Sequence, residues 1–212
     1  MGLLTPHSDP VTKVTIVPRG QALGVTQSTP LDDRYNYSRE YLMARIMMAL
    51  GGRGSEEVAL GSVTTGAEND FQVVTGIARQ MVTRWGMSDK VGTVSFSDRN
   101  SPFNGPGSME FGNREYSEET ARIIDEEVHD IVEQAYEQVK SLLREHRPTL
   151  DRIAQELRRH EVIDNKQLMA ILAETGVDLT TLPTPEGQEI AEGDRVPRIP
   201  PPSEPNISLV EP

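Results

Sequence analysis

The longest pattern of apolar positions lies in the second half of the chain and has the three- and four-residue spacing of an amphipathic helix. Between residues 117 and 146 these positions are Ile124, Val128, Ile131, Ala135, Val139 and Leu142. Ser117 and two glutamates stand at the start of the run, where a hydroxyl cap and acidic side chains stabilise a first turn. Because no glycine or proline interrupts it, we predict one long helix, packed on helices within 150–172.

Four shorter segments also have helical spacing. A helix capped by Ser38 carries Leu42, Ile46 and Ala49, and a second follows residues 65–68, whose hydroxyl and glutamate have the form of a capping box. Phe71, Val74, Ile77, Ala78, Met81 and Val82 give this second helix a broad apolar face, and Gly86 ends it. Pro148 opens the next helix, and Asp164 and Gln167 frame a last one that runs through Leu172.

Two segments have the period of β-structure instead. Residues 12–27 alternate around Val14 and Ile16 and contain the turn sequence Pro18-Arg19-Gly20, so we predict a hairpin there. Residues 93–96 are a candidate for a short strand, followed by a loop over 97–113 that is rich in Gly, Pro and Asn. The expected fold is therefore mainly α, with a small β-hairpin near the N-terminus.

Composition changes sharply after Gly176. Residues 177–212 contain 8 of the 15 prolines, seven acidic residues and only two basic ones. Such a segment buries too little apolar surface to offset the entropy of ordering it. We therefore divide the chain into a domain over 1–176 and a Pro-rich, acidic, disordered tail over 177–212.

Charge and residue usage exclude several classes of function. The formal net charge is −12, which repels phosphate backbones, so we expect no nucleic-acid partner. The chain has no cysteine, which excludes disulfides and thiolate metal sites. No apolar run has the length of a membrane helix, and the first ten residues do not have the pattern of a signal peptide. We expect a cytoplasmic chain.

Candidate chemistry is sparse. None of the four histidines is paired at the spacing of an HExxH motif, and no Gly-rich loop fits a phosphate-binding pattern. The dense carboxylates of residues 118–137 are interpreted as a solvated helix face rather than a metal site. One constellation remains, TTGAENDFQ at 64–72, which places Asp70 near a helix start. By its chemistry alone, Asp70 needs no role beyond favourable interaction with the helix dipole.

Five separate blocks together resemble the peptidase domain of the FtsH family of ATP-dependent zinc metalloproteases. They occur in the order KVTIVPRGQALG (13–24), GGRGSEEV (51–58), TTGAENDFQ (64–72), ARQMVTRWGMSDKVG (78–92) and YSEETARIIDEEV (116–128). The resemblance covers roughly residues 5–175. It implies a helical metallopeptidase (M41 type) domain that follows a membrane anchor and an ATPase module and assembles into a homohexamer, with polypeptides as substrates.

The resemblance also implies roles for individual residues. In the family, two histidines of an HExxH helix and a distant aspartate bind zinc, and that aspartate corresponds to Asp70. An edge strand near 22–27, around Gly24, Val25 and Thr26, is implied to pair with the extended substrate. Zn²⁺ is the implied cofactor of the complete enzyme, and ATP belongs to its upstream module.

The chain departs from the family at its start. Its 212 residues contain no HExxH, no ATPase module and no membrane helix. In the family, HExxH directly precedes the segment that here is LLTPHSDPV (3–11), so we expect the chain to begin just after the catalytic helix, with Met1 inside a longer reading frame. Gly54 and Ser55 also stand where alanines are usual. We expect residues 1–11 to be poorly anchored and an apolar groove, lined by residues such as Val73, Val74 or Ile77, to lie beside the Asp70 helix.

Three functional hypotheses remain open. The first is a fragment of the zinc protease, attached to the membrane's cytoplasmic face only through an anchor outside these residues and inactive alone. The second is a non-catalytic helical assembly or interaction module derived from that domain. The third, an active peptidase with other metal ligands, is disfavoured because the sequence contains no second cluster of such residues.

Overall fold

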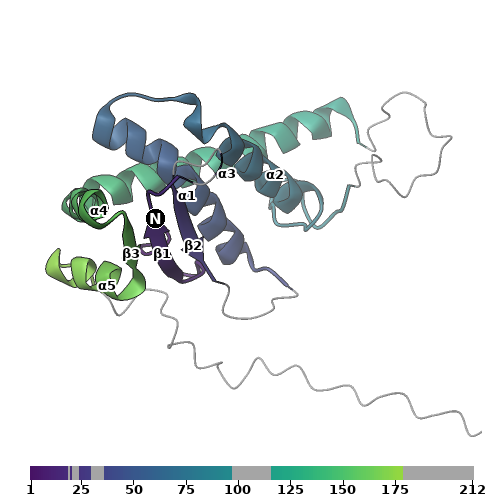
Figure 1. Cartoon of the computed structure of the whole chain (residues 1–212). Coiled ribbons are helices and arrows are strands. Elements are labelled where there is room, and N and C mark those ends of the chain that lie inside the picture. Colours follow the sequence, from purple (N-terminus) through teal and green to yellow (C-terminus); the bar gives the residue numbers. More distant parts are fainter. Residues whose placement is uncertain (19, 21–23, 30–35, 97–115, 179–212) are drawn as a thin grey trace, which may run out of the picture.

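Five α-helices and three short strands make up the part of the chain that the computed structural model describes, which is residues 1–18, 20, 24–29, 36–96 and 116–178 (Figure 1). The elements are β1 (Val11–Thr15), β2 (Val25–Ser28), α1 (Arg39–Ser55), the π-helical turn η1 (Glu56–Leu60), the 3-10 turn η2 (Thr65–Ala67), α2 (Glu68–Thr83), α3 (Glu118–Glu145), α4 (Arg147–His160), β3 (Val162–Asp164) and α5 (Asn165–Glu174). The mainly α class is confirmed. The predicted loop over 97–113 and nearly all of the predicted tail lie outside the described residues.

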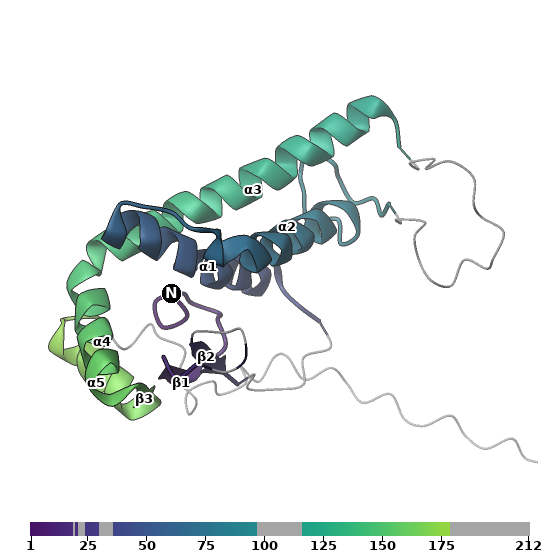
Figure 2. The ribbon, with the colours of Figure 1, turned by 45° about the horizontal axis from the view of Figure 1, so that its top comes forward.

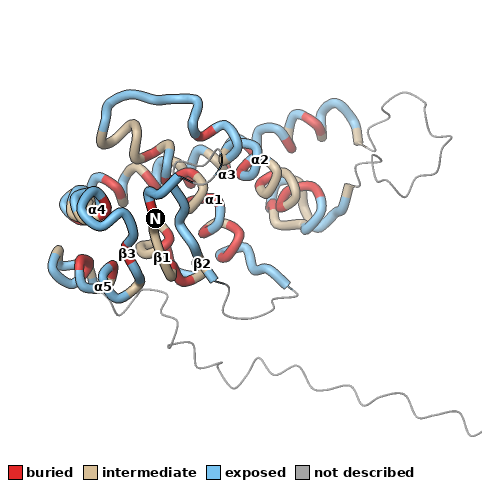
Figure 3. Tube along the Cα trace, viewed as in Figure 1, coloured by how far each residue is buried: buried red, intermediate tan, exposed pale blue. Residues whose placement is uncertain are grey.

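The main core lies where α1, α2 and α3 pack against one another (Figure 2). Each helix turns one apolar face inward, with Leu42 and Ile46 from α1, Val74 from α2 and Ile124 and Val139 from α3 almost fully buried. Figure 3 shows the buried positions recurring along the inner faces of these helices. α3 is one continuous helix, as predicted, but its main partners are α1 and α2. The predicted packing of its apolar face on residues 150–172 is wrong.

A smaller core joins the sheet to the last two helices. The strand order is β2-β1-β3, and both pairs are antiparallel, so the predicted hairpin is present. β3 adds to the other side of β1 and was not predicted, because three residues are too few to show a period of two. The residues of this second core are Val11, Leu157, Ile163, Leu168 and Ile171.

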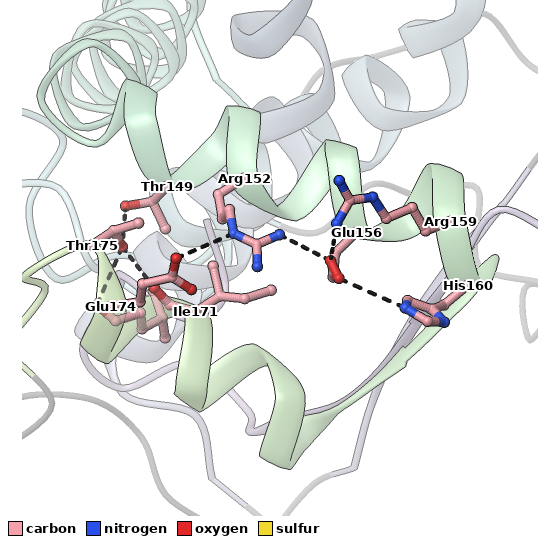
Figure 4. Close-up of polar contacts among 9 residues, drawn as sticks. Thr149, Arg152, Glu156, Arg159, His160, Ile171, Glu174 and Thr175 are labelled. Atoms are coloured by element: carbon pink, nitrogen blue, oxygen red, sulfur yellow. Dashed lines mark hydrogen bonds and ion pairs between the residues drawn. The ribbon is translucent and has the colours of Figure 1, made fainter.

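Polar contacts fix α5 against α4 (Figure 4). The Arg152 guanidinium reaches Glu156 at 2.9 Å on its own helix and Glu174 of α5 at 3.5 Å. The hydroxyls of Thr149 and Thr175 lie 2.8 Å apart, and Thr149 is buried. At the other end of α5, Asp164 and Gln167 form the capping box that their spacing predicted, with bonds of 2.8 and 3.0 Å.

The predicted strand at 93–96 is wrong. This segment has no strand structure, and it runs along the end of α2 instead. The Phe96 amide donates to the Thr83 carbonyl at 2.7 Å, and the Phe96 ring meets Tyr116 edge to face, with centroids 5.1 Å apart. Phe96 therefore packs against the main core, whereas Val94 is 45% exposed.

Candidate functional site

Asp70 lies in the first turn of α2, as the sequence predicted, but the turn that leads into the helix is built differently. Thr64, one residue earlier than the predicted cap Thr65, accepts a hydrogen bond from the Gly66 amide at 3.1 Å and starts the 3-10 turn η2. α2 then follows directly from η2. The capping-box form at 65–68 therefore identified the correct place in the chain but the wrong capping hydroxyl.

Glu56 holds this turn in place. Its carboxylate accepts from the Thr64 amide at 2.9 Å and from the Thr64 hydroxyl at 2.7 Å. These two hydrogen bonds hold the pKa of Glu56 below its usual range. Glu56 begins the π-helical turn η1, which continues α1. Sequence reasoning gave Glu56 no role, because its partner is eight residues away and outside any helical repeat.

A pocket with a volume of about 440 Å³ opens beside Asp70. Its lining combines the first two residues with parts of β2, α1, α2, α3 and α4, and includes Met1, Gly2, Thr26, Gly52, Asp70, Val73 and Ile77. The prediction of an apolar groove beside the Asp70 helix is thus confirmed for Val73 and Ile77. Val74 is fully buried in the main core instead.

Asp70 is half-buried and lines this pocket together with Met1 and Gly2. A Cβ added at Gly52 would lie 4.0 Å from Asp70 Oδ2, so α1 passes close to the carboxylate without filling the space in front of it. Among the described residues, no hydrogen bond or ion pair engages this side chain.

The N-terminal segment is packed, and the prediction that residues 1–11 are poorly anchored is wrong. Thr5, Ser8 and Val11 are buried. The Ser8 hydroxyl donates to the carbonyls of Gly2 at 2.6 Å and Thr5 at 2.9 Å, which closes the segment into a compact turn. Figure 2 shows this turn between the helical layer and the sheet. The bond from Ser8 to Gly2 spans six residues, which fits no helical or strand repeat, so the sequence pattern did not indicate this turn.

The predicted substrate-binding residues lie at an edge of the sheet. Val25 and Thr26 begin β2, which pairs with β1 on one side and with no described strand on the other. Figure 3 shows β2 as mostly exposed. Gly24 precedes the strand, and a Cβ there would lie 2.6 Å from the Thr15 carbonyl, so the close approach of the two strands requires glycine. Thr26 also lines the Asp70 pocket.

Other candidate ligands are not brought together. Within the described ranges, no three His, Asp or Glu side chains are placed to hold a metal ion. Several carboxylates of α3 instead form ion pairs with basic side chains, for example Asp125 with Arg79 at 3.1 Å. None of the described helices has the length and apolar character of a membrane span.

Comparisons with known proteins agree on one family. Residues 1–171 match the model of peptidase family M41. The chain is 54% identical over 173 residues, 81% of its length, to the ATP-dependent zinc metalloprotease FtsH of Thermobaculum terrenum, of which this covers 26%. It is 51% identical over 77% of its length to FtsH 3 of Conexibacter woesei, covering 21% of that protein.

A third relative matches almost the whole chain. The FtsH protease of Syntrophus aciditrophicus is 42% identical over 213 aligned residues, which cover 99% of this chain and 27% of the relative. The chain thus spans about a quarter of the length of the curated relatives it matches.

Proposed function

This chain belongs to peptidase family M41, and we propose that it forms part of the peptidase domain of an ATP-dependent zinc metalloendopeptidase of the FtsH type. The observation that carries the proposal is Asp70, a half-buried carboxylate without a described partner, at the head of α2 in a pocket next to an open strand edge. The complete enzyme would act on polypeptides as a homohexamer at the cytoplasmic face of a membrane.

The residues present fit zinc as part of a site. A catalytic zinc takes three protein ligands of the His and Asp or Glu type, and Asp70 supplies one such carboxylate in a pocket with room for further ligands. We propose that an HExxH helix supplies the two imidazoles and the general base. A metal held there contributes polarisation of the scissile carbonyl and a bound water of lowered pKa.

Glu56 and the edge strand β2 position the other parts of the proposed site. Glu56 fixes Thr64 and with it the turn that begins α2, so the direction of Asp70 depends on a carboxylate outside α2. The free edge of β2 offers backbone groups to an extended substrate, and main-chain pairing of this kind holds a peptide without regard to its sequence. The Thr26 side of the strand would bring that peptide past Asp70.

A second candidate function is a non-catalytic assembly or interaction module. The observation that favours it is the packing of the described residues, which form two apolar cores and a hydrogen-bonded N-terminal turn. In this alternative, Asp70 has no ligand and its substitution has no effect on any activity of the full-length protein.

Proteolysis assays separate the two candidates. The 212-residue chain alone, incubated with casein and Zn²⁺ with or without ATP, is expected to cleave nothing and to hydrolyse no ATP, because the sequence contains neither HExxH nor a nucleotide-binding loop. The full-length protein containing this chain is expected to cleave casein with ATP and to lose cleavage in Asp70→Ala. Chelator-sensitive cleavage by the 212-residue chain alone, lost in Asp70→Ala, would contradict the proposal.

A further inference from the structure

A second, polar pocket lies next to the Asp70 pocket along α1. Arg45 and Met48 of α1 line both pockets, and they join the Asp70 pocket to one lined by Ser8, Asp9, Ser28, Tyr37 and Tyr41. β2 forms the opposite side throughout, with Thr26 in the first pocket and Ser28 in the second. The two pockets therefore follow one another between α1 and the edge strand, and we call them together the groove.

The spacing of this groove matches an extended peptide. Thr26 and Ser28 are two residues apart, so they lie on the same side of β2 and repeat at about 6.7 Å, the repeat of alternate residues in a strand. Arg45 and Gly52 are seven residues apart on α1, which separates them by about 10 Å along the helix. Because Gly52 lies beside Asp70, Arg45 is about three peptide residues away from it.

Arg45 contributes a basic side chain to the lining of both pockets. Its side chain is exposed, and no hydrogen bond or ion pair engages its guanidinium among the described residues. Asp9, which lines the same polar pocket, is not ion-paired with it, and its Oδ2 accepts from the Tyr41 hydroxyl at 2.8 Å. A guanidinium presents five donors in a planar fork that matches a carboxylate.

We propose that Arg45 is a specificity-determining residue that binds the side-chain carboxylate of an Asp or Glu in an extended substrate peptide, two to four residues from the peptide bond held at Asp70. The proposal rests on the proposed function, because it places the substrate along β2. It narrows the substrate class from any unfolded polypeptide to segments with an acidic residue at this distance from the cleaved bond.

Peptide binding tests the proposal without any need for cleavage. Three fluorescein-labelled, C-terminally amidated nine-residue peptides of Ala, Thr and Val, with Glu, Gln or Lys at the centre, are titrated with the 212-residue chain and followed by anisotropy. The Glu peptide is expected to bind roughly three- to tenfold more tightly than the Gln peptide, as one ion pair with good geometry allows. The chain's net charge of −12 predicts the opposite order for non-specific binding, in which Lys is preferred.

Substitutions assign this preference to one residue. Arg45→Gln is expected to abolish the Glu preference, and Arg45→Glu to reverse it in favour of Lys. Arg39→Gln is the matched control, since Arg39 is an exposed arginine at the start of the same helix that lines neither pocket. A Glu preference unchanged in Arg45→Gln, equal affinity for the three peptides, or no binding would each overturn the proposal.

One further experiment tests whether the bound carboxylate belongs to a side chain or to the C-terminus of the peptide. Another tests the proposed function itself. A Gln peptide with a free C-terminus that bound as tightly as the amidated Glu peptide would show capture of a terminal carboxylate and contradict the side-chain assignment. In the full-length protein, cleaved peptides are expected to show the Glu preference at one position, two to four residues from the cut. If that protein cleaved none of these peptides while the 212-residue chain still preferred the Glu peptide in binding, the proposed function would fail. The role of Arg45 in binding would then stand.

Discussion

Gly54 shows how a single residue sets the approach of two helices. It is buried in α1 where that helix crosses α3. A Cβ at this position would lie 2.7 Å from Val139 Cγ1 and 3.0 Å from Leu143 Cδ1, both in the main core. From the sequence alone, Gly54 is only a weak helix former, about 1 kcal/mol less favourable than alanine. In the structure, the absent methyl group is what lets the helices meet.

Gly54→Ala is therefore expected to destabilise the chain by about 1–3 kcal/mol, because overpacking outweighs the gain in helix propensity. Urea denaturation of Gly54→Ala, Val139→Ala and the double variant measures this. The double variant is expected to be more stable than the sum of the two single effects, since Val139→Ala removes the clashing methyl group. A gain of about 1 kcal/mol in Gly54→Ala would contradict the packing argument.

The carboxylate of Glu127 binds the segment that follows α2 to helix α3. Its side chain on α3 is 13% exposed, and it lies 2.6 Å from the Lys90 ammonium and 2.7 Å from the Ser88 hydroxyl. Burial raises the pKa of this carboxyl, but the hydrogen bonds from Lys90 and Ser88 outweigh burial and leave the pKa below its ordinary value of 4.5. The ionised form therefore stabilises the folded state.

Glu127→Gln is expected to lower the free energy of unfolding at pH 7 by about 1–2 kcal/mol, through loss of charge-assisted hydrogen bonds. A carboxyl with a lowered folded-state pKa contributes its full stability above the unfolded value and loses it as pH falls through the folded value. The difference between Glu127→Gln and wild type should thus shrink below pH 4.5. Urea titrations from pH 7 to pH 3 measure it, with the exposed Glu126→Gln as control. A difference that is independent of pH would contradict the assignment.

At the scale of elements, hydrophobic spacing predicted the helices better than it predicted their partners. α3 is continuous from Glu118, and the caps Ser117 and Ser38 accept the expected backbone hydrogen bonds at 3.2 Å each. The packing of α3 on α1 and α2 was missed, since a one-dimensional pattern shows which face is buried but not what covers it. β3 and the N-terminal turn were missed for a similar reason, because both depend on contacts distant in sequence.

The inner face of α3 can be tested by charge placement. Val128 is 8% exposed and belongs to the main core. Val128→Asp buries an unpaired charge and is expected to cost at least about 4 kcal/mol, enough to unfold a marginally stable domain. Gln134→Asp is the control, because it introduces the same residue at an exposed position of the same helix. The measurement is thermal unfolding by circular dichroism, and an unchanged melting temperature in Val128→Asp would contradict the account.

At the scale of the whole molecule, the candidate site is assembled from distant segments. The resemblance identified Asp70 and the strand at 24–26, and the structure brings Asp70 and Thr26 to one pocket. Sequence reasoning gave Glu56, Arg45 and the N-terminal turn no role in this region. Glu56 lies in the block at 51–58, but its contact with Thr64 spans eight residues and no helical repeat indicates it. Their roles follow from the way α1 passes between the sheet and α2, with Gly52 and Arg45 on the side that faces the groove.

We propose Asp70 as a zinc ligand, and this role is tested by zinc retention in the longer protein that contains this chain together with an HExxH helix. Metal content is measured by mass spectrometry after gel filtration against a zinc chelator, for wild type, Asp70→Ala and the exposed control Asp89→Ala. Wild type and Asp89→Ala are expected to retain about one zinc per subunit. Asp70→Ala is expected to retain almost none, with an affinity at least about 100-fold lower, a loss greater than that of most outer-shell partners. Full zinc retention by a correctly folded Asp70→Ala protein would contradict the claim.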